Sequence, residues 1–331
     1  MNPTKSSKNS IFELIKQYKE ISTKDIQDRL GISKPVLHKH LNKLIEEGKI
    51  TKVGATPRVY YIINDKQTSS NMDSAGSKIN KLTVDFIDKN YLYITASGDI
   101  KFGFEGFSYW CKRTKQDIGK TANEYLVTVE KYNTYKKDGY IDGSAKLTSS
   151  FTSVGLDKLY YLDFYSIERF GKTKLGQMLL YAKQSQSKRI IADLVQNIKP
   201  AINDFITKYK IDAVGFIPPT VKREVQFMRE LEKGLSIELP IIKIIKVSGE
   251  IAVPQKTLSK IEDRIENARK TIMIKENRTF KNILLIDDAV GSGATLNETA
   301  LKLKQKISMK STIIGLSITG SYKGFDVISE I

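Results

Sequence analysis

Cysteine and histidine are nearly absent from this chain of 331 residues, and both shortages narrow its possible functions. The one cysteine, Cys111, has no partner for an intrachain disulfide, and a single cysteine also excludes a zinc ribbon. The two histidines, His38 and His40, lie close together, so none is available elsewhere for metal binding or acid–base chemistry. We therefore predict no metal site built from protein ligands.

Long apolar runs are also missing from the chain. No stretch approaches the ~20 residues that a membrane-spanning helix needs, and the N-terminus has no apolar signal region. We therefore expect a cytoplasmic protein with no membrane partner.

Acidic residues are outnumbered: 37 Asp and Glu face 54 Lys and Arg, which gives a formal net charge of +17. An excess of this size favours nucleic acid or another polyanion as a partner, although a basic surface can also serve solubility alone. The length of the chain is enough for two or three domains.

Residues 1–65 combine three helix patterns with two short strand patterns. Ser22 is placed to cap the second helix, STKDIQDRL, and Ser33 can cap the third, KPVLHKHLNKLIEEG. Residues 50–53 and 59–63 alternate like strands, and GATPR between them can form a wing. Two helices joined by a tight turn are typical of a helix-turn-helix, and the whole stretch resembles bacterial winged-helix domains.

The polar side of the third helix suits DNA, because such a helix would enter the major groove. Lys and Arg outnumber Asp and Glu by 13 to 7 between Met1 and Lys66. Duplex DNA is the expected partner, with structured or single-stranded nucleic acid as alternatives; winged helices also bind proteins, and lysines can form a merely solvated face. The candidate DNA-binding residues are Ser33, Lys34, His38, Lys39, Asn42 and Lys43 in this helix, with Arg58 in the wing.

Two less distinctive segments follow. Residues 66–78, KQTSSNMDSAGSK, are polar and without periodicity, which indicates a flexible linker. Residues 79–160 are rich in aromatic residues, with Gly and Asp between short apolar runs such as NYLYITASG and NEYLVTVEKY. This composition favours a strand-rich antiparallel middle region.

Residues 161–331 are predicted to form an α/β domain with a parallel sheet. Strand patterns at 212–217, 240–247, 282–286 and 311–319 alternate with helix patterns. Ligands in such sheets bind at the carboxyl ends of the strands.

One such strand leads into the motif ILLIDDAVGSGAT, residues 283–295. Its four apolar residues suit a strand buried on both faces of a sheet, and the residues after Thr295 suit a helix. A strand, a glycine-rich turn and a helix N-terminus together form an anion site, because backbone amides point inward and the helix dipole favours phosphate.

These residues carry a family resemblance. DDAVGSGAT after ILLI resembles the phosphoribosyl pyrophosphate (PRPP) loop of type I phosphoribosyltransferases. The longer stretch, with Gln255, Arg264 and Asn267 ahead of the loop, is similar to the ComF-like branch of that family. FIPPTVKRE stands where the family keeps its pyrophosphate-binding loop. The resemblance covers about half of the chain.

The resemblance implies a role for each part of the motif. Asp287 and Asp288 would accept hydrogen bonds from the ribose hydroxyls and form the catalytic pair. Mg2+ would be carried by the ligand and held mainly by its phosphate and ribose oxygens. The remaining loop residues, with the 5′-phosphate held from Gly291 onward, are Ala289, Val290, Gly291, Ser292, Gly293, Ala294 and Thr295. The implied pyrophosphate loop contains Pro219, Thr220, Lys222 and Arg223.

The sequence departs from relatives that salvage purines, which place an acid where this chain has Gly291. Two functions remain open. One is a PRPP-responsive transcriptional regulator without catalysis, as in purine repressors that share this domain order. The other is a phosphoribosyltransferase acting on an unknown acceptor, similar to the effectors of retron anti-phage systems. A ComF-like role in DNA uptake is a third alternative. A homodimer or a larger defence complex would suit either main function.

Overall fold

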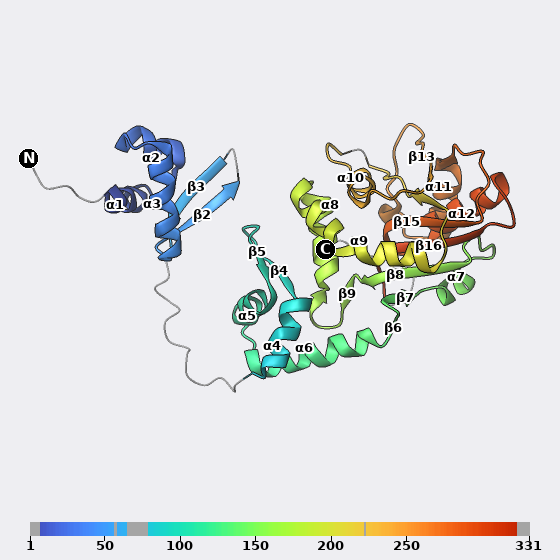
Figure 1. The fold of residues 1–331 in the computed structure, drawn as a ribbon, viewed down its shortest axis with the longest axis horizontal. Helices are drawn as coiled ribbons and strands as arrows, with labels where there is room; N and C mark the ends of the chain where they lie inside the picture. Colours follow the sequence, from blue (N-terminus) through green and yellow to red (C-terminus); the bar gives the residue numbers. More distant parts are fainter. Residues whose placement is uncertain (1–6, 56–57, 65–78, 222, 323–331) are drawn as a thin grey trace, which may run out of the picture. The chain divides into compact units, whose positions relative to one another are not determined.

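The computed structural model describes residues 7–55, 58–64, 79–221 and 223–322, and it contains two compact units, Met1–Ser77 and Lys78–Ile331 (Figure 1). The predicted linker at 66–78 lies outside the described residues. Within the described ranges, no helix is both long enough and apolar enough to cross a membrane.

The N-terminal unit contains three helices and a three-stranded sheet. The sheet is antiparallel and has the order β1-β3-β2. In chain order the elements are α1 (Ser7–Tyr18), β1 (Glu20–Ser22), α2 (Thr23–Leu30), α3 (Lys34–Glu46), β2 (Ile50–Ala55) and β3 (Arg58–Ile63). This arrangement confirms the predicted winged helix and adds the short strand β1, which the sequence patterns did not indicate.

Local signals explain where the helices of this unit begin and end. The Ser22 hydroxyl accepts a hydrogen bond from the Asp25 amide at 3.1 Å, so it caps α2 as predicted. Gly31 ends α2 in the left-handed conformation, which glycine adopts without strain. Ser33 stands at the N-cap of α3, but its side chain makes no capping hydrogen bond. The apolar faces of the helices meet in one core around Ile15, Leu37, Leu41 and Ile50.

The C-terminal unit is built on a seven-stranded sheet. Its helices are α4 (Lys81–Asn90), α5 (Gly103–Arg113), α6 (Ile118–Asn133), α7 (Ala145–Ser150), α8 (Lys174–Ser185), α9 (Lys188–Lys208), α10 (Phe227–Leu235), α11 (Ile261–Thr271) and α12 (Ala294–Lys306), with a 3-10 turn η1 (Gln255–Thr257). The strands of the large sheet are β6 (Lys136–Lys137), β7 (Tyr140–Asp142), β8 (Lys158–Phe164), β11 (Ala213–Phe216), β12 (Ile241–Ile242), β15 (Asn282–Val290) and β16 (Thr312–Gly320). Short two-stranded pairs join β4 (Leu92–Ile94) with β5 (Ile100–Phe102), β9 (Ser166–Ile167) with β10 (Gly171–Lys172), and β13 (Ile244–Lys246) with β14 (Ile272–Ile274).

The strand order of the large sheet is β12-β11-β15-β16-β8-β7-β6. The pairs from β12 to β8 are parallel, and β7 and β6 add an antiparallel edge. The α/β class with a mostly parallel sheet is therefore confirmed. The predicted boundary between residues 160 and 161 lies inside β8, whose partner β16 is near the end of the chain.

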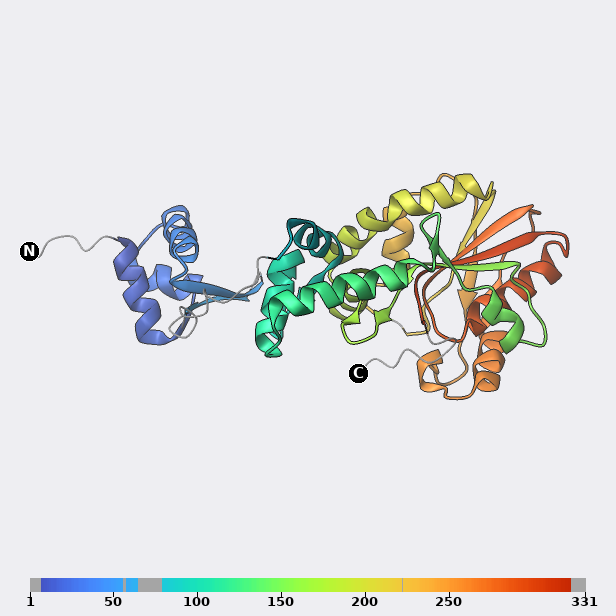
Figure 2. The same cartoon turned by 90° about the horizontal axis from the view of Figure 1, so that it is seen from below.

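Helices cover both faces of this sheet, and β15 is packed on each side. Ile283 and Leu285 belong to the core that includes Leu296 and Ala300 of α12. Leu284 and Ile286 belong to the core formed with α8, α9 and α10. Figure 2 shows the yellow helix α9 on one side of the strands and the orange-red helix α12 on the other. The apolar run therefore forms the doubly buried strand that its composition predicted.

The prediction of a strand-rich middle region at residues 79–160 is wrong for most of that region. The strands there are β4, β5, β6, β7 and the first residues of β8, whereas α4, α5, α6 and α7 together occupy more than half of residues 79–160. The aromatic residues favoured strands by composition, but their spacing is helical. Phe104, Phe107 and Cys111 recur on one side of α5, and Tyr125 and Tyr132 on one side of α6. Burial of these faces outweighs the strand preference of single aromatic residues.

Gly320 at the end of β16 touches the buried ring of Tyr161 on β8, and this contact leads to a stability prediction. A Cβ atom added at Gly320 would lie 2.3 Å from Cδ2 of Tyr161. We expect Gly320→Ala to destabilise the C-terminal unit by about 1–3 kcal/mol, since close-packed interiors do not accept such a contact. In thermal unfolding, Tm should fall by roughly 2–4 °C per kcal/mol.

Gly249→Ala is the matched control, because no atom lies within 4 Å of a Cβ added there. Its Tm should stay close to that of the wild type. An equal loss of stability in both variants would contradict the packing argument.

Candidate functional site

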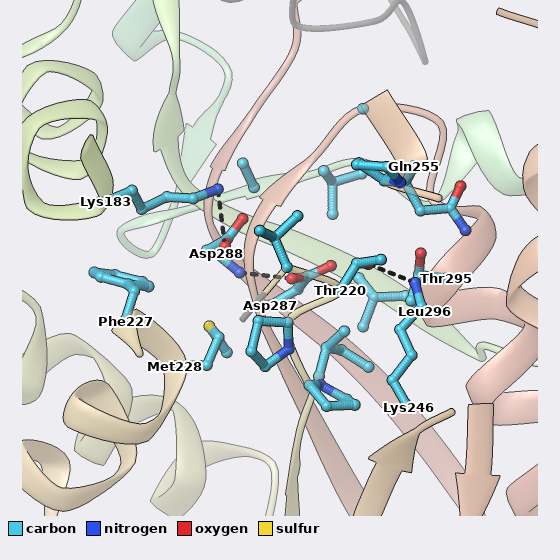
Figure 3. Close-up of a pocket in the computed structure, with 18 of the residues that line it drawn as sticks. Lys183, Thr220, Phe227, Met228, Lys246, Gln255, Asp287, Asp288, Thr295 and Leu296 are labelled. Carbon is cyan, nitrogen blue, oxygen red and sulfur yellow. Dashed lines mark hydrogen bonds and ion pairs between the residues drawn. The ribbon is translucent and has the colours of Figure 1, made fainter. Parts of the chain in front are cut away.

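The acidic pair lies where β15 extends beyond its neighbour β11. Strand β11 ends at Phe216, which pairs with Ile286, whereas β15 continues to Val290 beside β16. Asp287 and Asp288 are therefore part of the strand, not of the following loop as the sequence motif suggested. One side of the strand is left unpaired at this level, and the segment after β11 turns away to form a wall of a cavity (Figure 3).

The two carboxylates make different contacts because successive strand residues point to opposite faces. Asp288 forms an ion pair with Lys183 of α8, with 3.0 Å between Oδ2 and Nζ. Asp287 accepts a hydrogen bond at Oδ1 from the backbone amide of Asp288 at 2.8 Å. Figure 3 shows both acids at the centre of the cavity.

A tight turn joins β15 to α12. Gly293 has a φ of 75°, in the left-handed region that glycine tolerates, and it occupies the N-cap of α12. Gly293 has no side chain to cap this helix, and the Ser292 hydroxyl accepts a hydrogen bond from the Ala294 amide at 3.4 Å. First-turn amides of a helix have no intrahelical acceptors, so this N-terminus offers donors to an anion.

Buried polar contacts fix the direction of α12. Asn297 is fully buried; its Oδ1 accepts from the Gly155 amide at 2.8 Å, and its Nδ2 donates to the Ser153 carbonyl at 2.9 Å. The middle region therefore holds the first turn of the helix in place.

The predicted pyrophosphate loop follows β11 and lines the same cavity. Thr220 accepts a hydrogen bond at Oγ1 from Lys246 Nζ at 2.7 Å. Arg223 is exposed at the rim and donates to the Lys183 carbonyl. Pro219 is exposed in the cavity wall, and Lys222 lies outside the described residues.

The cavity has a volume of about 290 Å3, near the lower end of the range for small-ligand sites. Four basic and two acidic side chains line it, so its charge suits an anionic ligand. All the predicted loop residues from Asp287 to Thr295 are among its lining residues. Nowhere among the described residues do three or more His, Cys, Asp or Glu side chains gather as a metal site would require.

Burial shifts the ionisation of the charged groups in this cavity. It raises the pKa of Asp287 above its ordinary range, and the Asp288 carboxylate adds to the rise; the Asp288 amide, Lys183 and Lys246 offset it in part. Burial also lowers the pKa of Lys246, against the opposing effect of Asp287. Ionisation of Asp287 therefore lowers the stability of the ligand-free protein, as is common for charged groups at functional sites.

This cost leads to a prediction with a defined pH dependence. An acid whose pKa is raised by folding loses stability as pH rises from its ordinary pKa near ~4 to the raised value. Asp287→Asn removes that loss, so the ligand-free variant should melt above the wild type at pH 8, with a smaller difference at pH 4. Melting curves at the two pH values test this, and a larger difference at the acidic pH would contradict it.

Lys183 and Lys246 are site residues that sequence reasoning missed. They belong to α8 and β13, far from the motif in the chain, and neither stands in a distinctive pattern. The missing signal was spatial. Only after the sheet has formed does Lys183 pair with Asp288, and only then does Lys246 interact with the charge of Asp287.

The candidate DNA-binding surface lies on the N-terminal unit. Leu37, Leu41 and Leu44 face its core, which leaves the opposite side of α3 to solvent. Arg58 begins β3, but its side chain is outside the described part of the chain. On the outer side of α3 the predicted residues are exposed or, for His38, half-exposed: Ser33, Lys34, His38, Lys39, Asn42 and Lys43.

Comparison with known families agrees with the fold of this unit. Residues 7–51 match the family model described as "Winged helix-turn-helix DNA-binding". The N-terminal unit contains a winged helix-turn-helix. The match ends at the start of β2, so it covers the helices of the winged-helix unit and reaches only the first residues of its hairpin.

Comparisons for the whole chain are more distant. No curated protein matches it. Among solved structures, a hypoxanthine-guanine phosphoribosyltransferase from Bacillus anthracis str. 'Ames Ancestor' is 14% identical, with a TM-score of 0.26, over 41% of this chain and 70% of that one. A hypoxanthine phosphoribosyltransferase from Staphylococcus aureus is 18% identical, with a TM-score of 0.24, over 41% of this chain and 68% of that one.

Proposed function

We propose that the C-terminal unit binds PRPP together with Mg2+ in the cavity at the end of β15, and that the winged-helix unit binds duplex DNA. One observation carries the first part of this proposal. An acidic pair, a glycine turn and a helix N-terminus line the same cavity as Lys246 at the end of β13 and the loop after β11. Each of these groups suits a different part of a phosphorylated ribose.

The assignment follows from charge and donor type. The turn and the amides of α12 would hold the 5′-phosphate, because they present donors and a positive dipole. Asp287 and Asp288 would accept the ribose hydroxyls. Lys246, Thr220 and Arg223 would face the pyrophosphate, whose charge they offset in part. Lys222 of the same loop belongs to this proposal on sequence grounds.

Mg2+ fits this site as a companion of the ligand and not as a resident metal. The described residues offer a pair of carboxylates but no larger acidic group. Mg2+ commonly retains waters and binds through one or two carboxylates together with phosphate oxygens. When bound, it would neutralise part of the pyrophosphate charge.

Transfer of phosphoribose to an acceptor is the reaction that this arrangement supports. The bond between ribose C1 and the pyrophosphate oxygen would break, and a bond from C1 to an acceptor atom would form, with pyrophosphate leaving. The basic residues would stabilise the leaving group, and the acids would hold the ribose in position. A transferase with an unknown acceptor would fit an anti-phage effector of the retron type.

A PRPP-responsive regulator is the second candidate. It is favoured by the winged helix and by Gly291, which stands where purine-salvage relatives have an acid. In this case ligand binding alone would shift the affinity for DNA, and no acceptor would be needed.

The deciding experiment is incubation of the purified protein with Mg2+ and PRPP while pyrophosphate release is followed. A panel of nucleobases, nucleotides and nucleic acids supplies acceptors. Acceptor-dependent release that is lost in the Asp287→Asn/Asp288→Asn variant would establish a transferase. PRPP binding that changes DNA affinity without release would establish the regulator, and failure to bind PRPP would reject both.

A further inference from the structure

Arg264, near the start of α11, is a buried cation with an unused donor. Its side chain is only 5% exposed. Its Nε donates to the Leu258 carbonyl at 2.6 Å, whereas its Nη2 has no hydrogen-bond partner within the part of the chain that the structure describes. Burial lowers the pKa of Arg264, but a guanidinium stays protonated at physiological pH.

A buried charged group with an unsatisfied donor raises the free energy of the ligand-free protein. Arg264 is one of the residues that line the cavity of the acidic pair. Nη2 is buried in the ligand-free structure. A change in the terminal side-chain torsions would present it to a ligand in the cavity. A bound anion would satisfy both the charge and the unused donor.

Contacts between α11 and α12 indicate which end of the cavity Arg264 lines. Arg269 Nε donates to Glu298 Oε2 at 3.0 Å, and farther along Lys302 Nζ donates to the Ile272 carbonyl. The two helices therefore advance side by side in the same direction. Moving back along α11 from Arg269 leads toward the beginning of α12. Gln255, which is hydrogen-bonded to this turn of α11, and Thr295 of α12 both line the cavity (Figure 3).

Hydrogen bonds hold the backbone at Arg264 in place before any ligand binds. Gln255 Nε2 donates to the Arg264 carbonyl at 3.1 Å and to Asn267 Oδ1 at 3.2 Å. Gln255, Arg264 and Asn267, whose spacing alone assigned them no role, therefore form one hydrogen-bonded group. Such fixation reduces the ordering cost of binding.

We infer that Arg264 is a ligand of the phosphate monoester at the N-terminus of α12, and so supplements the backbone amides at the 5′-phosphate end of the cavity. This inference rests on the proposed binding of PRPP. It separates the basic residues into two sets: Arg264 serves the 5′-phosphate, and Lys246 with Arg223 serves the pyrophosphate.

Calorimetric titration of the full chain with three ligands tests the inference: PRPP, ribose 5-phosphate and inorganic pyrophosphate, each with Mg2+. Arg264→Gln should weaken the binding of PRPP and of ribose 5-phosphate at least about tenfold, because a charge-assisted hydrogen bond is lost. The affinity for pyrophosphate should stay unchanged. Arg264→Lys, which keeps the charge, should recover part of the loss. Lys270→Gln on the exposed side of α11 is the matched control and should bind like the wild type.

The outcomes separate this inference from the proposed function. Unchanged binding of ribose 5-phosphate by Arg264→Gln, or an equal loss for pyrophosphate, would overturn the role of Arg264 while PRPP binding by the wild type still stood. A wild type that binds neither PRPP nor ribose 5-phosphate would overturn both. A lowered Tm of the ligand-free variant with equal loss of all three ligands would mark a structural role and also overturn the inference.

Discussion

The variant Asp287→Asn/Asp288→Asn is expected to bind PRPP at least about 100-fold more weakly than the wild type. Each carboxylate supplies charged acceptors for ribose hydroxyls, and a hydrogen bond to a charged group contributes about 1.5–3 kcal/mol. The loss should occur without unfolding, because Asp287 is itself held at a cost in the ligand-free protein. Isothermal titration with PRPP and Mg2+ measures the effect.

Two comparisons make this result specific. Asp204→Asn, an exposed acid on α9, should bind PRPP like the wild type. The double variant should still bind duplex DNA in the absence of PRPP, since the winged helix has its own core. Retained affinity for PRPP in the double variant would reject the assignment of the acidic pair.

The second large effect concerns the outer side of α3. Replacement of Lys34, Lys39 and Lys43 with alanine should weaken binding to a short mixed-sequence duplex on the order of 100-fold at low salt. The slope of log affinity against log salt should become shallower by about 0.9 for each lysine that contacts a phosphate. Fluorescence anisotropy over a range of salt concentrations measures both quantities.

The matched control removes three exposed lysines from the C-terminal unit, Lys233, Lys270 and Lys310. It lowers the net charge equally but should change affinity and slope only slightly. Equal effects in the two triple variants would show that general positive charge, and not α3, binds the DNA.

Much of the fold was predictable because its signals are local. The winged helix followed from caps and periodicity, and Ser22 caps α2 as its position indicated. The parallel sheet followed from alternating strand and helix patterns. The middle region was not predictable in this way, because its aromatic residues fit a strand by composition and a helix by spacing. Packing among Tyr91, Phe107 and Tyr125 decided for helices, with ring centroids 5.2 to 5.6 Å apart.

The candidate site was likewise predictable only where its residues are contiguous in the sequence. By itself the sequence determined the acidic pair, the glycine turn and the helix that follows, because these are contiguous and their chemistry can be recognised in order. Only the tertiary structure decided that β15 outruns β11, that Lys183 reaches Asp288, and that Arg264 lines the same cavity. Those relations join segments remote in the chain, and they exist only once burial of both sheet faces has fixed the positions of the helices.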